Sequence, residues 1–194
     1  REALAKSEFK RYLQPEVDMR KGTVVGAEAL MRWLHPERGI LLPASFLPVV
    51  EGTETAIEIG DWVINESLRQ LDAWLSESGI RVSVSINIAG NHLQNPGFSQ
   101  RLGELLSRYP AVLPEQIELE ILETAALADV GTTAALFAEC RNLGVGFALD
   151  DFGTGYSSLT YFRRLPADIL KIDQSFVRDM LDNPDDLAIV EGVI

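Results

Sequence analysis

The sequence of 194 residues contains a single cysteine, Cys140, so no intrachain disulfide can form. A lone thiol is typical of a reducing compartment, and we expect a cytoplasmic chain, or the cytoplasmic part of a membrane-anchored protein. We interpret Cys140 as a buried helix residue. No stretch approaches the roughly 18 consecutive apolar residues of a membrane span, and residues 1–9 lack the apolar core of a signal peptide. We therefore expect no membrane contact from this segment.

Positive charge is also scarce. Lys and Arg total 17 against 29 Asp and Glu, for a net charge of −12, and no run is rich in Lys or Arg. This balance argues against binding duplex nucleic acid through its phosphates. A phosphate-bearing partner would have to be attracted by something other than the overall field, and a metal ion is the obvious candidate. The 46% hydrophobic and 24% charged composition is that of a globular domain.

Apolar periodicity predicts strands that alternate with helices. Residues 1–9 are expected to form a short helix or the end of a linker from an upstream domain. The predicted strands are 9–18, 24–30, 82–88, 117–122, 145–149 and 169–172, the first two joined by a tight turn at 20–22. The predicted helices are 57–75, 96–109, 128–143, 157–165 and one that begins near Pro184, with a loop at 35–43.

This alternation predicts a parallel sheet with right-handed crossovers. In the third strand Val84 and Ile86 share one face while Ser85 and Asn87 share the other. One apolar and one polar face suit a barrel wall better than a sheet covered by helices on both sides. We therefore predict an α/β fold, a (β/α) barrel of the TIM type, rather than an open doubly wound sheet.

About six strands are fewer than the eight of a closed barrel, which typically takes ~250 residues. We expect residues 10–194 to form a barrel domain that lacks its last strands. Removal of a C-terminal part, disorder of that part, or a partner chain that fills the gap would each account for this.

Oxygen-bearing side chains stand at or near the ends of several predicted strands: Glu28, Asn87, Glu120, Glu123, Asp150 and Asp151. In a barrel these ends meet at one mouth, where buried carboxylates need compensating cations. Only His35 and His92 are present, in no zinc-like pair, so oxygen ligands favour Mg²⁺ or Mn²⁺. The adjacent aspartates suit the two-metal pattern of phosphodiester hydrolysis. Taken singly, each residue is more often a solvated strand end, a turn or a cap. Glu118 is interpreted as exposed or salt-bridged.

The segment DDFGTGYSSL at 150–159 has two glycines that permit a sharp bend directly after the acidic pair. It lacks the lysine of a phosphate-cradling loop. Two interpretations remain: a plain connection from strand to helix, or a mobile lid that carries ligands and senses substrate.

Five segments together resemble the EAL domain family, the phosphodiesterases that open cyclic di-GMP. They are YLQP at 12–15, EALMRW at 28–33, LEILET at 119–124, DDFGTGYSSL at 150–159 and LKID at 170–173. The likeness runs in order from about residue 4 to residue 194. It implies a barrel with an antiparallel first strand, incomplete here at the C-terminus.

The resemblance also implies roles for individual residues. It implies metal ligands at Glu28, Asn87, Glu120 and Asp150, with Asp151 joining at a second metal. Lys171 would orient the attacking water, and Glu123 would anchor the lid loop. The implied substrate contacts are Gln14, Leu30 and Arg32, with Asp173 near the site.

The sequence departs from the family in two places. Asn87-Ile88-Ala89 stands where the family usually has NxS, and the late EGVET and QGY motifs are absent. Glu191-Gly192-Val193 falls in the last predicted helix, so we assign Glu191 no catalytic role. We therefore expect the 194-residue segment alone to be inactive.

The hypothesis favoured for the parent domain is a phosphodiesterase that uses two Mg²⁺ or Mn²⁺ ions to hydrolyse cyclic di-GMP to linear pGpG. The alternatives are a non-catalytic cyclic di-GMP receptor and a regulatory or dimerisation module. We also expect a homodimer, and fusion to upstream sensory or regulatory domains.

Overall fold

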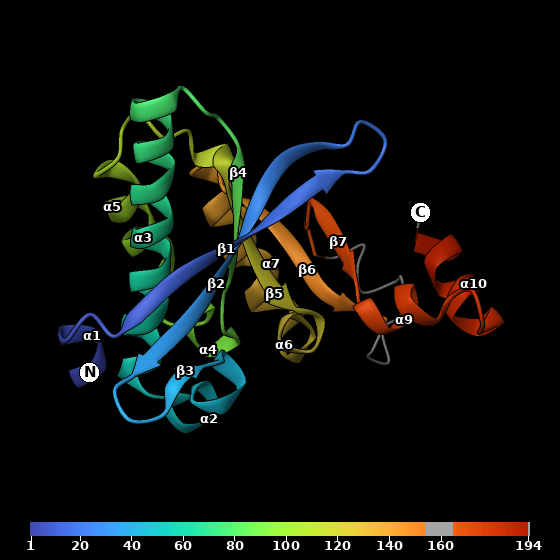
Figure 1. Cartoon of the computed structure of the whole chain (residues 1–194), viewed down its shortest axis with the longest axis horizontal. Coiled ribbons are helices and arrows are strands. Elements are labelled where there is room, and N and C mark those ends of the chain that lie inside the picture. The colour runs from blue at the N-terminus through green and yellow to red at the C-terminus, as the bar shows by residue number, and fades with distance from the viewer. Residues whose placement is uncertain (154–164, 194) are drawn as a thin grey trace.

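The computed structural model describes residues 1–153 and 165–193, which form an α/β fold around one curved sheet (Figure 1). The strands are β1 (Phe9–Asp18), β2 (Thr23–His35), β3 (Gly39–Leu41), β4 (Ser83–Asn87), β5 (Ile117–Leu122), β6 (Gly146–Phe152) and β7 (Ile169–Ile172). Their order in the sheet is β1-β2-β4-β5-β6-β7, with β3 paired to β2. β1 is antiparallel to β2, as is β3, and the pairs β2–β4, β4–β5, β5–β6 and β6–β7 are parallel.

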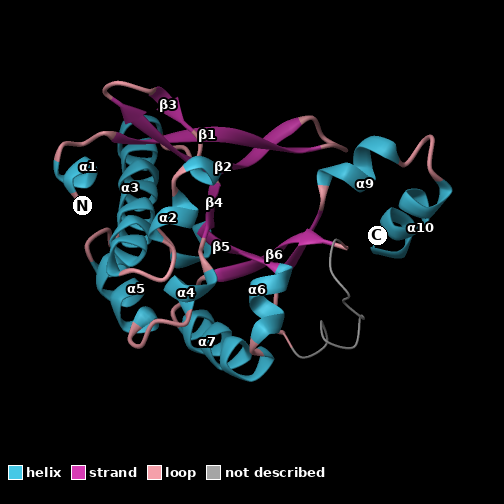
Figure 2. Ribbon diagram, turned by 90° about the horizontal axis from the view of Figure 1, so that it is seen from below, coloured by secondary structure: helices cyan, strands magenta, loops and turns pink. Residues whose placement is uncertain are grey.

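Helices cover the outer face of this curved sheet, and α3, α5 and α7 lie along it in Figure 2. The helices are α1 (Glu2–Ala5), α2 (Leu47–Val50), α3 (Glu54–Ser78), α4 (Gly90–Leu93), α5 (Phe98–Ser107), α6 (Glu123–Ala128), α7 (Val130–Asn142), α9 (Gln174–Asp179) and α10 (Pro184–Val193). Among the described residues β1 and β7 each pair along one edge only, so the sheet is an open barrel wall. The predicted incomplete TIM-type barrel with an antiparallel first strand is confirmed.

Strand alternation positions the core as predicted. Val84 and Ile86 on β4 are fully buried on the face that packs against helices, where Leu68 and Leu71 of α3 meet them in the same apolar cluster. α3 ends at Gly79, whose φ of +65° favours glycine and whose N–H donates to the Leu75 carbonyl. The opposite face of the strands carries polar side chains and is the inside of the barrel wall.

The sequence missed some short elements, among them α6, which ends directly before α7. The helix expected at 128–143 is confirmed as α7, which the Asp129 carboxylate caps by accepting a hydrogen bond from the Thr132 N–H at 3.0 Å. The loop expected at 35–43 contains β3, and α9 was not foreseen. The helix expected at 157–165 falls on residues 154–164, outside the described residues.

Single residues interpreted as structural behave so. Cys140 is fully buried on α7, and burial raises the pKa of its thiol to about 12. His92 on α4 is also buried, with Nε2 at 2.8 Å from Asp61 on α3. Glu191 is exposed on α10. In the part of the chain that the structure describes, no helix combines the length and apolarity needed to cross a bilayer.

Candidate functional site at the barrel mouth

Strand register brings the predicted carboxylates to one face. Glu28 on β2 pairs with Ser85 on β4, and Asn87, two residues later, pairs with Glu120 on β5. Residues paired in register share a face of the sheet, as do residues two apart on one strand. Asp150 follows Ala148, the partner of Glu120, by two residues. All four predicted ligands therefore face the barrel interior.

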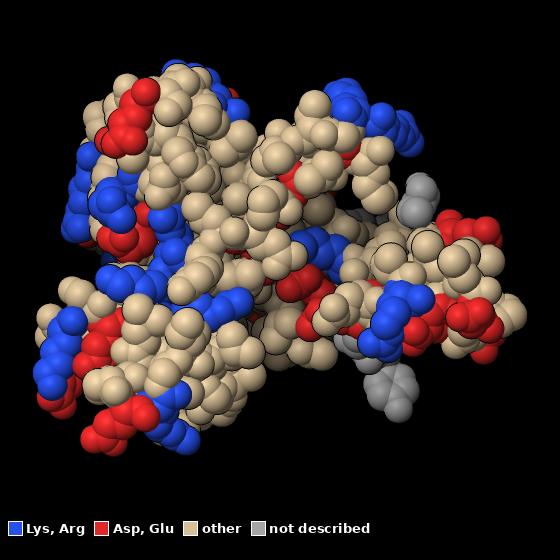
Figure 3. Space-filling view, in the orientation of Figure 1, with Lys and Arg blue, Asp and Glu red and all other residues tan. Residues whose placement is uncertain are grey.

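Direct contacts join most of this group. Asn87 Nδ2 donates to Glu28 Oε1 at 2.8 Å. Lys171 on β7 reaches across the mouth, with Nζ at 2.5 Å from Glu120 Oε1 and 3.8 Å from Glu28 Oε2. Residues from β2, β4, β5 and β7, remote in sequence, thus form one contact network. In Figure 3 basic and acidic side chains gather at the centre, between the β1–β2 hairpin and the C-terminal helices.

Glu120 has the most perturbed environment of these residues. Its side chain is buried, and burial raises the pKa of its carboxyl to about 7; the nearby Glu28 and Asp150 add to the rise, while Lys171 opposes it. Its Oε1 is paired with Lys171, but its Oε2 is buried with no hydrogen-bond partner among the described residues. A buried carboxylate with one unpaired oxygen favours a neighbouring cation.

The donor set suits a hard divalent cation, because it consists of carboxylates and one amide. As the side chains stand, no three Asp, Glu, His or Cys within the described ranges converge closely enough to enclose an ion. Instead the Lys171 ammonium supplies the positive charge beside Glu120. An Mg²⁺ or Mn²⁺ ion that ligates Oε1 of Glu120 would therefore have to displace this ammonium.

Asp151 and Asp173 meet beside this network. Asp151 has a φ of +55°, uncommon for a residue with a side chain, at the point where the β6–β7 pairing shifts register. Its carboxyl is hydrogen-bonded to that of Asp173; burial, then the charge of Asp150, raises the pKa of Asp151. Asp173 caps α9 by accepting from the Ser175 N–H at 2.9 Å, and its hydrogen bonds to Ser175 lower its pKa.

Glu123 is buried at the start of α6, three residues after Glu120 along the chain. Its Oε2 accepts a hydrogen bond from the Gly153 N–H at 3.2 Å. Gly153 lies within the segment 150–159, where the lid was predicted. Residues 154–159 of that segment lie outside the described residues. The structure thus places the Glu123 carboxylate against the Gly153 N–H.

The predicted substrate contacts lie along the hairpin. Gln14 is paired with Glu28 across β1 and β2, and Leu30 and Arg32 follow Glu28 on the same face of β2. Arg32 Nη1 donates to the Met31 carbonyl at 2.8 Å. The Arg32 guanidinium also lies 5.9 Å from the ring centre of Tyr12, a residue that sequence reasoning had not selected.

A second polar layer was missed. Ser85 Oγ lies 3.1 Å from Glu16 Oε1 and 3.3 Å from Glu118 Oε1, inside the barrel. The Ser85–Glu118 pair comes two residues before the Asn87–Glu120 pair along β4 and β5. Burial, then the charge of Glu16, raises the pKa of Glu118. The interpretation of Glu118 as exposed or salt-bridged was wrong. Its separation of two residues from Glu120 was the available signal, because it places both on one face.

Comparison with known proteins agrees with this geometry. The model of the EAL domain matches residues 1–194. A protein of Pseudomonas aeruginosa named bifunctional diguanylate cyclase/cyclic di-GMP phosphodiesterase MucR is 36% identical over 194 residues, 100% of this chain and 28% of that protein. The P. aeruginosa cyclic di-GMP phosphodiesterase PA2567 is 36% identical over 186 residues, 96% of this chain and 31% of that protein.

Solved structures agree as well. The P. aeruginosa MucR phosphodiesterase in complex with c-di-GMP superposes with a TM-score of 0.92 at 35% identity, covering 99% of this chain and 77% of that one. The FimX EAL domain of P. aeruginosa bound to c-di-GMP gives 0.87 at 26% identity, covering 98% and 76%. The chain spans less than a third of the length of the two curated relatives named above. From its sequence, fold and site, the chain belongs to the EAL domain family.

Proposed function

We propose that this domain is a metal-dependent phosphodiesterase that hydrolyses cyclic di-GMP to linear pGpG in bacterial second-messenger signalling. The observation that carries the proposal is the contact network of Glu28, Asn87, Glu120 and Lys171 at the barrel mouth. Relatives that share the whole of this fold are named cyclic di-GMP phosphodiesterases.

Charge supports a requirement for cations. The chain carries −12 overall, and a cyclic dinucleotide brings two phosphodiester charges of the same sign. Glu28, Asn87, Glu120 and Asp150 would hold one Mg²⁺ or Mn²⁺, and Asp151 would join at a second. Four carboxylates contribute −4 and two such ions +4, so the site would no longer repel its substrate. When bound, the ions would acidify a water and stabilise charge on the phosphoryl oxygens.

The side chains of the mouth have separate tasks in this proposal. The Lys171 ammonium, released from Glu120, donates a hydrogen bond that orients the attacking water. Arg32 offers positive charge to a phosphate and Leu30 an apolar surface to a base, while Gln14 provides an amide on the adjacent strand. Asp173 holds Asp151 in place, and Glu123 fixes the start of the 153–159 segment through the Gly153 N–H.

The direct test measures pGpG formed from cyclic di-GMP by the full natural chain that contains these residues, with Mg²⁺ or Mn²⁺. We expect Lys171→Met to lower kcat by about 100-fold or more with a smaller change in KM. Arg81→Met is the matched control, because Arg81 is exposed and outside the site. Absence of turnover by the folded wild-type chain with both metals would refute the enzyme proposal.

A receptor without catalysis is the second candidate. It is favoured by the ion pair between Lys171 and Glu120, which neutralises the most buried carboxylate without a metal. Calorimetry with Mg²⁺ or Mn²⁺ present separates the two: tight binding with intact ligand recovered would indicate the receptor. The proposal also includes a homodimer and fusion to sensory or regulatory domains; light scattering that gives a strict monomer would remove the dimer.

A further inference from the structure

Arg11 on β1 is a half-buried cation with incomplete hydrogen bonding. Its Nη2 donates to Gln70 Oε1 on α3 at 2.7 Å. Its Nε and Nη1 are buried and have no hydrogen-bond partner among the described residues. Burial lowers the pKa of the guanidinium, with the charge of Glu66 opposing that shift. Unpartnered donors on a buried charge are costly unless an anion approaches them.

The adjacent carboxylate is already engaged elsewhere. Glu66 on α3 receives Arg69 in a forked contact, with Nη2 at 2.8 Å from Oε2 and Nε at 3.2 Å from the same oxygen. Arg11 and Arg69 therefore face one carboxylate, and the local charge is about +1 on a chain whose net charge is −12.

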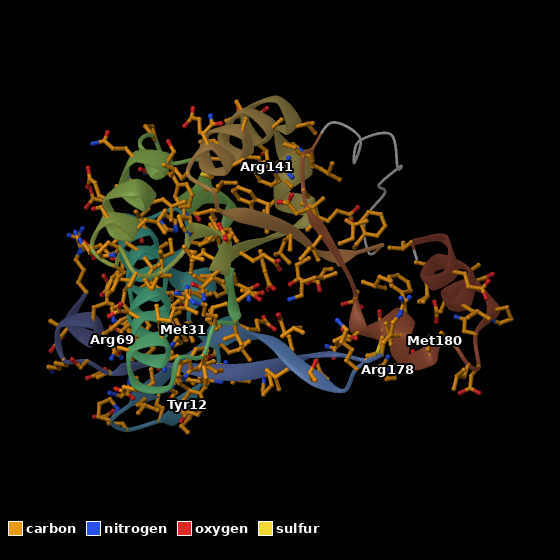
Figure 4. All side chains as sticks on the ribbon, turned by 90° about the horizontal axis from the view of Figure 1, so that it is seen from above. Tyr12, Met31, Arg69, Arg141, Arg178 and Met180 are labelled. Atoms are coloured by element: carbon orange, nitrogen blue, oxygen red, sulfur yellow. The ribbon has the colours of Figure 1, made fainter. Side chains whose placement is uncertain are left out.

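These side chains line a cavity of about 260 Å³ between α1, β1 and α3. Leu4 and Trp62 also line a neighbouring cavity of about 640 Å³, which reaches α5 and is lined by equal numbers of arginines and acids: Arg1, Arg101, Arg108, Glu58, Asp61 and Glu104. We call the smaller cavity the basic groove. Figure 3 shows Lys and Arg side chains gathered where α1, α3 and β1 meet, and Figure 4 shows Arg69 at the opposite end of the molecule from Arg178.

We propose that the basic groove binds a phosphate group against Arg11 and Arg69. A water could accept the unpartnered N–H groups, but it carries no charge to offset the surplus. A phosphate supplies hydrogen-bond acceptors as well as negative charge, because its anionic oxygens match the planar guanidinium fork. The larger cavity has room for an organic part of the ligand beyond Trp62.

This site is separate from the barrel mouth. Arg11 and Tyr12 are neighbours on β1, so their side chains point to opposite faces of the sheet. Tyr12 lies beside Arg32 on the inner face, whereas Arg11 contacts Gln70 of α3 on the outer face. A ligand at the mouth and a phosphate in the basic groove should therefore bind together without competition.

The test titrates inorganic phosphate into the protein in EDTA, at constant ionic strength set with NaCl, and follows the Arg Nε–Hε resonances and the melting temperature. We expect saturable shifts at Arg11, and binding weakened at least tenfold by Arg11→Gln. Arg81→Gln is the matched control, since that arginine is exposed outside the groove. Equal affinity in the two variants would overturn the proposal.

Two further arms cover the remaining outcomes. If Arg11→Gln does not fold, Arg69→Gln should weaken phosphate binding about threefold or more, and an unchanged affinity would overturn the proposal. AMP binding more tightly than phosphate would identify a phosphorylated metabolite as the ligand, and equal affinities would identify free phosphate. Binding lost on adding saturating cyclic di-GMP would place the phosphate at the mouth and refute the separate site.

Discussion

Glu120 illustrates how burial and charge oppose each other at a single residue. Its neighbours on the barrel wall include two further acids and one ammonium, yet burial outweighs the lysine and raises the pKa of the carboxyl to about 7. The folded protein therefore holds a proton there at a pH where the unfolded chain, in which the carboxyl has its ordinary pKa of 4.5, has lost it.

Stability without metal should accordingly fall with rising pH. Between about pH 4.5 and pH 7 the folded state binds more protons at Glu120, so its contribution is present at low pH and lost as pH rises through 7. We expect the free energy of unfolding in EDTA to drop by on the order of 2 kcal/mol from pH 5 to pH 8. Urea denaturation across this range measures it.

Glu120→Gln should reduce that slope. Some slope should remain, because the pKa of Glu118 is also raised. Glu77→Gln, at an exposed position near the end of α3, is the matched control and should leave the slope unchanged. An identical slope in Glu120→Gln and wild type would contradict this account.

The thiol of Cys140 should react as a core residue. It is fully buried, and burial raises its pKa to about 12, so thiolate is scarce at neutral pH. We expect labelling by a thiol reagent to be at least 100-fold slower in the native protein than in guanidinium chloride. Because Cys140 is the one thiol of the chain, its fast labelling in the native protein would show that α7 opens readily.

At the level of elements, helix α3 depends on one small residue. A Cβ built on Gly60 would lie 2.1 Å from Nδ1 of His92, the buried side chain that also contacts Asp61. The helix and α4 therefore approach more closely than any larger residue allows.

Gly60→Ala should destabilise the fold by about 1–3 kcal/mol, although alanine favours helix, because the methyl group overpacks against His92. Chemical denaturation with unchanged m-value measures the loss. Gly192→Ala in α10 is the matched control, since no atom lies within 4 Å of its added Cβ. It should be neutral or slightly stabilising. Equal effects in both variants would show that α4 can move away.

Elements with regular periodicity were predictable from sequence. β5 and β7 occupy the predicted residues, and the alternation in β4 correctly separated the core face from the inside of the barrel. The helix α6 was not predicted, because it is only six residues long and ends at Ala128, directly before the Asp129 cap of α7. β3 and α9 are too short to show a period.

The candidate site, too, was predictable from the sequence only in part. Strand ends predicted that Glu28, Asn87, Glu120 and Asp150 lie at one mouth, together with Glu123 and Asp151. Only the family resemblance singled out the first four as one ligand set. The ion pair between Lys171 and Glu120 was not predictable, because it depends on how far the sheet curves between β5 and β7. The approach of Glu16 to Ser85 likewise depends on the register of the antiparallel hairpin, which shifts between Glu16 and Val17.

For the whole molecule, net charge governs encounter with an anionic ligand. A chain at −12 repels a dinucleotide at long range even where the site itself attracts it. With Mg²⁺ fixed at saturation, we expect the association rate of cyclic di-GMP to rise severalfold from 20 to 200 mM NaCl. Stopped-flow fluorescence measures this, and a rate that falls with salt would mean that local attraction at the mouth dominates.

The ammonium of Lys171 gives the mouth a counterion that is part of the chain itself. Because it rests on Glu120, the barrel can assemble before any external ion arrives. In the proposed metal-dependent enzyme, a divalent ion that ligates the same oxygen would face a tethered competitor, so its apparent affinity would reflect an exchange and not simple addition. Metal binding and the release of Lys171 from Glu120 would accordingly be one event.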